Sequence, residues 1–580
     1  MQIKINGRDI EVNSSETIFQ AALRNRIEIP HLCYDPDLPP TGSCRLCICE
    51  VNGRIMSTCD TKVADNMVVE TETKKVIRLR KINIELLLSR HKDEEKTVSQ
   101  LQKLKKKYKI KNTRFNKKSC EVKSSKDKSV LKIADKDSGR KNNSNLSICL
   151  DNSKCILCGK CVNKCRLTQG VNALCFEGRG NEGLKITTAF DDMLKRSVCV
   201  DCGQCVLVCP SGALHEVDDI SKVVAAIENP KKHVVVQTAP AIRASIGEEF
   251  GLPAGTLVTK KMVASLKEAG FDKVFDTNFG ADLTIVEEAT EFISRAAKGG
   301  PFPQFTSCCP AWIKYVEQFY PQFIPYLSSC KSPNRMLGCI AKTYYANKMG
   351  LHPNNIVVVS IMPCTAKKAE CKRPDFHKHP DVDIVLTTRE AARFLKQKGI
   401  DLTKMNDEEE FDNPLGEATG AGVIFGATGG VTEAALRTVY EFVTGNGVTN
   451  PEFNQIRGLP KIKEGSITMK GTVYNFAVAH GLSNAKILME QLKEGKSKYH
   501  FIEIMACPGG CIGGGGQPIP TNDSIREKRI DALYREDRNM PFRKSHENPS
   551  IKKLYDEFLG KSGSAKAHKL LHTAFTKRKA

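Results

Sequence analysis

Long apolar runs are absent from this sequence of 580 residues. None approaches the roughly 20 apolar residues that a membrane-spanning helix needs, so we expect no membrane span. Aromatic residues are also scarce, at 6% with a single Trp, which weakens the nucleic-acid binding that a net charge of +22 would otherwise suggest. Much of the positive excess lies in one Lys-rich stretch. We therefore expect no nucleic-acid partner and favour an acidic protein partner attracted by opposite charge.

The N-terminus also lacks the form of a targeting segment. Residues 1–12 alternate apolar and polar side chains as a strand does, without the apolar core of a secretory signal. The 24 cysteines of the chain fall largely in clusters, which in a reducing compartment indicates metal binding rather than disulfides. We therefore expect a cytoplasmic protein, and its length predicts three or more domains.

The first cysteine cluster belongs to a small predicted fold at the N-terminus. Short strands are expected at 2–5 and 9–12, followed by a helix near 17–24 and a cysteine-bearing loop. Four thiolates from one loop and a returning strand can close a tetrahedral pair around two irons. A structural zinc ion is the alternative that the spacing leaves open. The four ligands would be Cys33, Cys44, Cys47 and Cys59.

The chain changes character after an amphipathic helix predicted over 76–88. Residues 92–145 are rich in Lys, Ser, Asn and Asp and poor in large apolar groups. Such a segment cannot bury enough surface to offset its ordering entropy, so we expect a helical stub followed by a mobile linker. No cysteine occurs between Cys59 and Cys120.

A doubled cysteine motif follows the linker. Each half has the spacing C-x2-C-x2-C-x3-C, and a proline follows the last cysteine. In such repeats the fourth cysteine of each half binds the cluster of the other half, and a chance zinc site would not repeat in register. One 4Fe-4S cluster would use Cys155, Cys158, Cys161 and Cys209, and the other Cys199, Cys202, Cys205 and Cys165.

From residue 231 onward the sequence alternates between strand and helix patterns, which indicates an α/β fold built from parallel strands. Cys364 and Cys507 directly follow two of these strands, where open α/β sheets place their ligands. The glycine-rich segment 426–430 could cradle an anion or only begin a helix. Strands are predicted at 234–237, 273–276, 356–360, 383–387 and 501–504, and helices at 284–298 and 389–398.

Three stretches in this region carry the most specific signal. They read TSCCPAW at 306–312, MPCTAKKAE at 362–370 and MACPGGCIGGGGQP at 505–518. Glycines beside two thiols let the backbone approach a large inorganic cofactor closely. Together the stretches resemble the active-site motifs of the iron-only (FeFe) hydrogenases, complete and in the family's order. The resemblance covers nearly the whole chain and fails only at roughly 90–145.

The resemblance implies an enzyme that reversibly reduces protons to H₂ at a six-iron H-cluster. Four cysteines would hold its 4Fe-4S half, and Cys511 would bridge to a two-iron subsite carrying CO and cyanide. Lys367 would contact a cyanide ligand, with a surface ion pair to Glu370 as the alternative. Met362 and Met505 would line the cavity. The four cluster ligands would be Cys309, Cys364, Cys507 and Cys511.

The resemblance also implies a proton route from solvent to this site. The Cys308 thiol would pass protons to the distal iron. Glu288, Glu291 and Arg295 share one face of a predicted helix, and with Ser328 they match the family's route. Ion pairing on a helix surface is the alternative for that row. Seven cysteines, Cys330 among them, remain without a cluster or relay role and are expected to be small buried apolar groups.

At one position the sequence departs from the family. In related long enzymes a histidine and three following cysteines hold a further 4Fe-4S cluster. This chain has His91 but no such cysteines. We therefore expect that cluster to be absent and His91 to face solvent, which leaves one 2Fe-2S cluster, two 4Fe-4S clusters and the H-cluster.

The predicted architecture is multidomain, α/β and α+β. The N-terminal domain resembles the β-grasp plant-type ferredoxins, and the doubled motif resembles bacterial ferredoxins. The end of the chain resembles the small subunit that other hydrogenases carry separately. The predicted domains are 1–80 (2Fe-2S), 81–145 (helix and linker), 146–220 (two 4Fe-4S), 228–520 (H-cluster) and 521–580 (small-subunit-like tail).

The resemblance further implies partners and a place in the cell. Electrons would come from a ferredoxin or from a flavin- and NADH-binding subunit, and maturation proteins would build the two-iron subsite. A hydrogen-producing organelle with an uncleaved import signal is the alternative compartment. Two other classes of function are an iron–sulfur assembly protein of hydrogenase-like fold, which lacks the full motifs, and a hydrogen-sensing regulator, which usually carries a signalling domain. No signalling domain is visible in the sequence.

Overall fold

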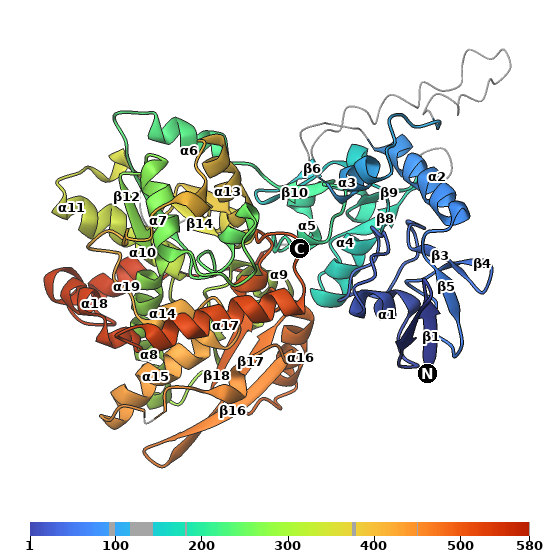
Figure 1. Ribbon diagram of the computed structural model, residues 1–580. Helices are drawn as coiled ribbons and strands as arrows, with labels where there is room; N and C mark the ends of the chain where they lie inside the picture. The colour runs from blue at the N-terminus through green and yellow to red at the C-terminus, as the bar shows by residue number, and fades with distance from the viewer. Residues whose placement is uncertain (92–98, 116–142, 180–182, 374–378, 449, 579–580) are drawn as a thin grey trace, which may run out of the picture. The chain divides into compact units, whose positions relative to one another are not determined.

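The computed structural model describes residues 1–91, 99–115, 143–179, 183–373, 379–448 and 450–578 (Figure 1). The chain divides into two compact units. In the described part of the chain, no helix combines the length and the apolar character needed to cross a bilayer. The first unit comprises 1–167, 172–197 and 208–215, and the second comprises 168–171, 198–207 and 216–580.

The first unit begins with a mixed five-stranded sheet of order β2-β1-β5-β3-β4. Strand β1 runs antiparallel to β2 and parallel to β5, and helix α1 packs Ile18 and Phe19 into the apolar core of the sheet. A capping box between Thr17 and Gln20 fixes the start of α1. This is the β-grasp arrangement expected from the sequence. The elements are β1 (Gln2–Ile5), β2 (Arg8–Glu11), α1 (Ile18–Arg24), β3 (Ile48–Val51), β4 (Arg54–Ser57) and β5 (Val68–Glu70).

Helix α2 (Lys74–Arg90) contains the helix predicted over 76–88. Its buried Arg80 donates hydrogen bonds to the carbonyls of Leu46 and Ile48 and so ties the helix to the cysteine loop. His91, expected to face solvent, is instead partly buried, with Nδ1 3.0 Å from a backbone carbonyl. That contact replaces part of the hydration the ring would have as a freely exposed side chain.

The predicted linker begins with the expected helical stub, α3 (Gln100–Lys107). Residues 92–98 and 116–142 of the linker lie outside the described residues.

The region of the doubled motif contains a small sheet of order β10-β7-β6 and a hairpin of β8 and β9. These elements are β6 (Asn143–Ser144), β7 (Ile148–Leu150), α4 (Lys160–Asn163), β8 (Cys175–Glu177), β9 (Lys185–Thr187) and β10 (Leu214–Glu216).

The second unit contains two four-stranded sheets. The first has the order β12-β11-β14-β15 with all strands parallel, as predicted. The second has the order β13-β18-β17-β16, and the prediction of parallel strands is wrong for its β16–β17 pair, which is antiparallel. The hairpin was missed because β16 alternates in burial and carries few large apolar side chains. The strands are β11 (His233–Thr238), β12 (Lys273–Asp276), β13 (Gln304–Phe305), β14 (Ile356–Met362), β15 (Ile384–Thr387), β16 (Ile462–Met469), β17 (Thr472–His480) and β18 (Phe501–Met505).

Helix α8 (Thr277–Ala297) lies between the two main cores of the second unit. Phe279 and Leu283 pack into one core, and Ile285 and Phe292 into the other. The helix begins earlier than the predicted residue 284, because the Asp276 side chain caps it by accepting a hydrogen bond from the Asn278 backbone N–H. The other helices before the tail are α5 (Gln204–Leu207), α6 (Ile220–Ile227), α7 (Thr259–Glu268), α9 (Pro310–Phe319), α10 (Pro333–Ile340), α11 (Ala346–Lys348), α12 (Ala366–Glu370), α13 (Thr388–Gln397), α14 (Gly420–Ile424), α15 (Gly430–Thr444) and α16 (Leu482–Lys493).

The tail of the chain packs onto this unit with three helices, coloured red in Figure 1. A buried ion pair joins Arg437 of α15 to Asp537 of α17, at 2.8 Å. Further along, the Asn548 side chain caps α18 and also donates to Asp282 of α8. The chain then returns so that His572 bridges to Cys330. The helices are α17 (Asp523–Asn539), α18 (Pro549–Leu554) and α19 (Ala565–Leu571).

Candidate functional site

Three loops of the second unit converge on one cavity. One loop follows β13 and ends where Cys309 begins α9, the second follows β14, and the third follows β18. Because β13 and β18 are parallel neighbours, their carboxyl ends lie at the same edge of a sheet. The predicted residues that line the cavity are Cys308, Cys309, Met362, Cys364, Lys367, Met505, Cys507 and Cys511.

Glycines let the third loop close around the cavity. Gly510 has φ +93°, and a Cβ there would lie 2.7 Å from the Thr428 nitrogen. A Cβ on Gly514 would lie 2.2 Å from the Pro363 carbonyl oxygen. Both distances are too short for any side chain, so the run of glycines is required for the loops to meet.

The four predicted H-cluster cysteines form no disulfide. Burial raises the pKa of Cys364 to about 12, with the neighbouring Cys309 adding to the effect. Burial, then Cys364 and Cys309, raise the pKa of Cys511 as well. Four sulfur donors at an apolar cavity suit an iron–sulfur cluster, because sulfur is a soft ligand for iron. The positive charge of the iron would compensate the repulsion between the four thiolates. The residues present therefore fit the group that the sequence implies.

Lys367 reaches this cavity from α12. Its Nζ donates to the Cys308 carbonyl at 3.1 Å and to Glu370 Oε2 at 2.9 Å. Burial alone would lower the pKa of Lys367, but Glu370 raises it above its ordinary value, so the ammonium stays charged. The ion pair between Lys367 and Glu370, expected in the alternative interpretation, is present. The prediction that it lies on the surface is wrong, because the Lys367 side chain is only 10% exposed.

The row predicted to carry protons lies along α8. Burial, then Glu291, raises the pKa of Glu288 to about 8, against the opposing effects of Ser328 and Arg295. The Ser328 hydroxyl donates to Glu291 Oε2 at 3.1 Å, and Arg295 Nη2 donates to Glu291 Oε1 at 2.5 Å. The ion pair between Arg295 and Glu291, expected on the helix surface, is therefore present. The two side chains are only 13% and 16% exposed, so the pair lies mostly within the protein.

Cys308 lies beyond the inner end of this row. Burial raises the pKa of Cys308 well above its ordinary value, followed by the effects of Cys309 and Glu288. The structure thus brings Cys308 within electrostatic reach of Glu288. No hydrogen bond between these two side chains is present in the described residues.

The sequence did not reveal the role of Glu503, a carboxylate buried on β18. It accepts hydrogen bonds from the backbone of Gly429 at 2.7 Å and of Thr432 at 2.8 Å, at the start of α15. The anion held by the glycine-rich segment 426–430 is therefore this side chain. The sequence did contain a signal for this residue, because Glu503 is the one charged residue in the apolar run 501–505.

The N-terminal cysteine sets are brought together within the first unit. Cys33 makes side-chain contacts with Cys44 and Cys59, and Cys47 does so with Cys59. In the doubled motif, burial raises the pKa of Cys161, with smaller effects from its three predicted co-ligands, Cys158, Cys209 and Cys155. Both sets thus have the proximity that a cluster requires.

The second predicted 4Fe-4S ligand set is divided between the units. Cys199, Cys202 and Cys205 lie in the second unit, and the fourth ligand, Cys165, lies in the first. The loop 199–205 packs against the catalytic loops. Cys202 is close enough to contribute to the raised pKa of Cys507, after burial and Cys364. Gln204 Nε2 donates to the Gly513 carbonyl at 2.9 Å. The loop 199–205 is therefore fixed beside the loop that carries Cys511.

Comparisons with known proteins match both units of the chain. Four family models match: iron only hydrogenase large subunit, C-terminal domain, at 232–515; iron hydrogenase small subunit at 523–578; 2Fe-2S iron-sulfur cluster binding domain at 1–74; and 4Fe-4S dicluster domain at 154–213.

Similar proteins and structures extend over most of the chain. The NADP-reducing hydrogenase subunit HndD of Solidesulfovibrio fructosivorans is 43% identical over 100% of this chain and 99% of its own. Iron hydrogenase 1 of Clostridium pasteurianum is 40% identical over 99% and 100%. The cytosolic Fe-S cluster assembly factor narfl of Xenopus tropicalis is 33% identical over 69% and 86%. A structure of the [FeFe]-hydrogenase HydA1 from Chlamydomonas reinhardtii matches at 43% identity and a TM-score of 0.57, over 63% of this chain and 100% of that one.

Proposed function

This chain belongs to the iron-only (FeFe) hydrogenases, and from that premise we propose that it interconverts protons and H₂ at a six-iron H-cluster. The observation that carries the proposal is the cavity lined by five cysteines, two methionines and the charged Lys367. When bound, the cluster would supply the electrons and an open iron position for the reaction. Its four thiolate ligands would be Cys309, Cys364, Cys507 and Cys511.

The residues around the cavity have separate tasks in this proposal. The Lys367 ammonium would donate to a cyanide ligand, since Glu370 keeps it charged and the Cys308 carbonyl holds it in place. Met362 and Met505 would exclude water and give soft contacts. These side chains bind and orient, and the redox chemistry belongs to the cofactor.

Protons would travel between the cavity and solvent along α8. The Cys308 thiol would exchange a proton with Glu288, and Ser328 would link Glu288 to Glu291. Arg295 would hold the Glu291 carboxylate at the outer end of the route. A carboxyl with a pKa of about 8 can both accept and release a proton near neutral pH, which suits Glu288 for the inner step.

The N-terminal clusters would relay electrons. We propose one 2Fe-2S cluster on Cys33, Cys44, Cys47 and Cys59, and two 4Fe-4S clusters on the doubled motif in the ligand sets given above. The domain boundaries follow the same assignment: 1–80, 81–145, 146–220, 228–520 and 521–580.

The electron partner is proposed to be a subunit that handles NAD(P)H. HndD, which this chain matches over nearly its whole length, is named as one subunit of an NADP-reducing hydrogenase. A ferredoxin is the alternative. Copurification with partner subunits, followed by H₂-dependent NADP⁺ reduction by the complex, distinguishes the two. A chain that accepts electrons only from reduced ferredoxin excludes the NAD(P)H-linked partner.

Gas chromatography of the matured, fully metallated protein with an excess of reductant tests the catalytic proposal. We expect H₂ from the native protein and none from apoprotein lacking the two-iron subsite. A sample with full iron content that produces no H₂ would overturn the proposal and favour an assembly function instead.

A further inference from the structure

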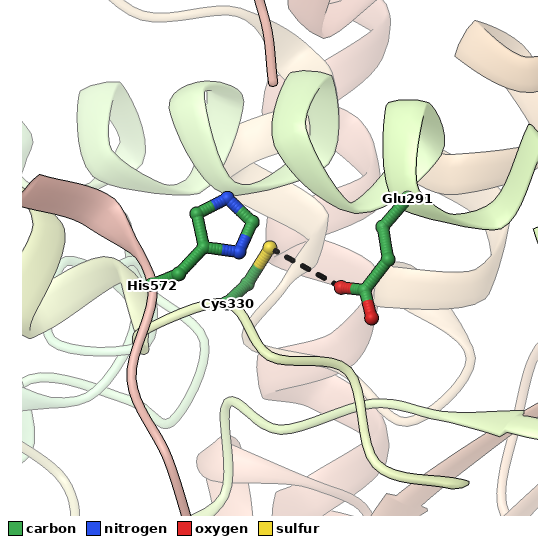
Figure 2. A group of neighbouring side chains, drawn as sticks. All are labelled: Glu291, Cys330 and His572. Atoms are coloured by element: carbon green, nitrogen blue, oxygen red, sulfur yellow. Dashed lines mark hydrogen bonds between the residues drawn. The ribbon is translucent and has the colours of Figure 1, made fainter. Parts of the chain in front are cut away.

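Glu291, Cys330 and His572 form a second cluster of potential metal ligands, outside the cavity (Figure 2). One ligand atom from each residue lies within 4.8 Å of the other two. Glu291 comes from α8, Cys330 from the segment before α10, and His572 from the end of the tail. Cys330 and His572 are buried, whereas Glu291 is partly exposed, so an ion from solvent could reach the cluster.

The backbone holds these three residues in register. Cys330 and His572 form an antiparallel bridge, and it is flanked by hydrogen bonds from Lys331 N to Leu571 O and from Thr573 N to Ser329 O, both 2.8 Å. The two side chains are therefore placed by the pairing of two backbone segments. The site exists only when the tail is docked.

A set of outer partners orients the histidine. Nε2 of His572 lies 3.1 Å from Glu287 Oε2, and the other oxygen of Glu287 accepts a hydrogen bond from the Tyr555 hydroxyl. A carboxylate on one imidazole nitrogen is the usual device that fixes a metal-binding histidine. The nitrogen left for a metal is Nδ1, which bonds the Ser329 hydroxyl at 2.8 Å. Figure 2 shows that this ring nitrogen faces the Cys330 sulfur.

The electrostatics of the cluster favour a cation. Burial raises the pKa of Cys330 well above its ordinary value, and Glu291, Glu288 and Glu287 add to the effect. Arg295 donates to Oε1 of Glu291, whereas Oε2 accepts from Ser328 Oγ, Ser329 N and Ser329 Oγ and lies 4.0 Å from Cys330 Sγ. A divalent ion would be attracted by these carboxylates and would displace the thiol proton.

We propose that Glu291 Oε2, Cys330 Sγ and His572 Nδ1 bind a Zn²⁺ ion, with water as the fourth ligand. Zinc accepts this mixture of oxygen, sulfur and nitrogen in tetrahedral geometry, at about 2.3 Å to sulfur and about 2.0 Å to nitrogen and oxygen. Those bond lengths require about 3.5 Å between sulfur and oxygen, against the observed 4.0 Å. The Ser329 hydroxyl, 3.2 Å from Oε2 and 2.8 Å from Nδ1, would have to rotate away to admit the ion. Binding releases the Cys330 proton to solvent.

The consequence rests on the proposed proton route. Glu291 is the outer carboxylate of that route, and a bound zinc ion would occupy the oxygen that now accepts from Ser328. Zinc would therefore stop proton delivery while leaving the iron–sulfur clusters able to take up electrons. The tail would thus supply a histidine for an inhibitory metal site.

The test uses matured holoenzyme freed of adventitious metal and titrated with ZnCl₂. Bound zinc is counted by mass spectrometry, and zinc K-edge X-ray absorption reports its ligands without interference from iron. We expect one zinc ion with a single sulfur at about 2.3 Å and at least tenfold inhibition of H₂ evolution. Dithionite reduction of the clusters, followed by electron paramagnetic resonance, should be unaffected.

Variants separate this site from other zinc binding. Cys330→Ala should lose the sulfur signal and the inhibition, and His572→Gln should weaken zinc binding at least tenfold. Cys339→Ala, at another buried cysteine, and His568→Gln, at an exposed histidine stacked on His572, serve as matched controls. Zinc bound without sulfur, or bound equally well by Cys330→Ala, overturns the proposal. Zinc bound as expected to a protein that makes no H₂ supports the site and refutes the hydrogenase proposal instead.

Discussion

Gln204 donates a hydrogen bond of 2.9 Å to the Gly513 carbonyl, and so joins the loop 199–205 of the second ferredoxin half to the loop that carries Cys511. Asp201 of the same loop makes a second contact, an ion pair of 2.7 Å with Lys314 of α9. Gly203 lies between them at φ +68°. An electron-donating cluster on this loop would be held against the catalytic loops by fixed contacts rather than by a transient encounter.

The first prediction concerns Gly203→Ala. A Cβ at this position would lie 2.4 Å from Thr365 Oγ1 and 3.1 Å from Gly515 Cα, so the loop must move away from the catalytic loops. We expect H₂ evolution to fall on the order of tenfold or more, because small displacements of positioned groups are costly. Infrared spectra of the CO and cyanide ligands should be unchanged. Gly7→Ala is the control, since Gly7 has φ +76° but open space around its Cβ.

The second prediction concerns Cys308→Ala. The variant removes the proposed proton donor beside ligand Cys309 but leaves all four cluster ligands. Iron content and infrared spectrum should match the native protein, while turnover falls about 10²–10⁴-fold, as expected for loss of one proton-transfer group. Full activity in this variant would refute the relay role of Cys308.

The third prediction follows from the raised pKa of Glu288. A carboxyl with a folded pKa of about 8 and an ordinary value of 4.5 binds its proton more tightly in the folded state. Its contribution to stability is therefore complete below about pH 4.5 and is lost as pH rises through about 8. Glu288→Gln should remove this part of the pH dependence of unfolding, measured by denaturant titration at several pH values.

The same variant should also alter catalysis. The native pH profile of H₂ evolution should contain an ionisation near pH 8 that is absent from Glu288→Gln. The remaining activity should fall by about 10²-fold or more. A native profile without that ionisation, together with an active Glu288→Gln, would place the proton route elsewhere.

The fourth prediction concerns Glu503→Gln. Both carboxylate oxygens accept backbone N–H groups at the start of α15, and an amide would turn its NH₂ toward one of those donors. We expect a loss of about 1–3 kcal/mol in the free energy of unfolding from the unsatisfied buried group. Glu464→Gln, on the exposed face of β16, should change stability by less than about 0.5 kcal/mol. Equal effects in both variants would contradict the buried role of Glu503.

Sequence motifs located the catalytic loops because each is short and its chemistry is local. TSCCPAW, MPCTAKKAE and the glycine-rich loop each combine cysteines with residue types that are needed only where the chain closely approaches a cofactor. Two of the strands that carry the loops, β14 and β18, were visible as apolar runs, whereas β13 has only two residues and was not predicted. In contrast, β16 alternates in burial and offers no such run, so the hairpin and the second sheet could not be predicted.

Long-range partners were the part that the sequence could not provide. Glu503 and the 426–430 segment are far apart in sequence, and only the fold brings the carboxylate to the helix start. His572 and Cys330 are likewise separated by most of the catalytic domain, and Cys330 alone looked like a small buried apolar group. A single sequence contains no signal for such pairs, because each residue is ordinary until its partner is known.

The fifth prediction concerns the number of clusters. One 2Fe-2S cluster, two 4Fe-4S clusters and a six-iron site would contain about 16 irons, whereas a further histidine-ligated 4Fe-4S cluster would raise the total to about 20. No cysteine follows His91 before Cys120, and the His91 ring lies 3.0 Å from the Lys154 carbonyl through Nδ1. We therefore expect about 16 irons in matured protein by mass spectrometry, and the same number in His91→Ala. A loss of about four irons in that variant would show that His91 recruits a cluster after all.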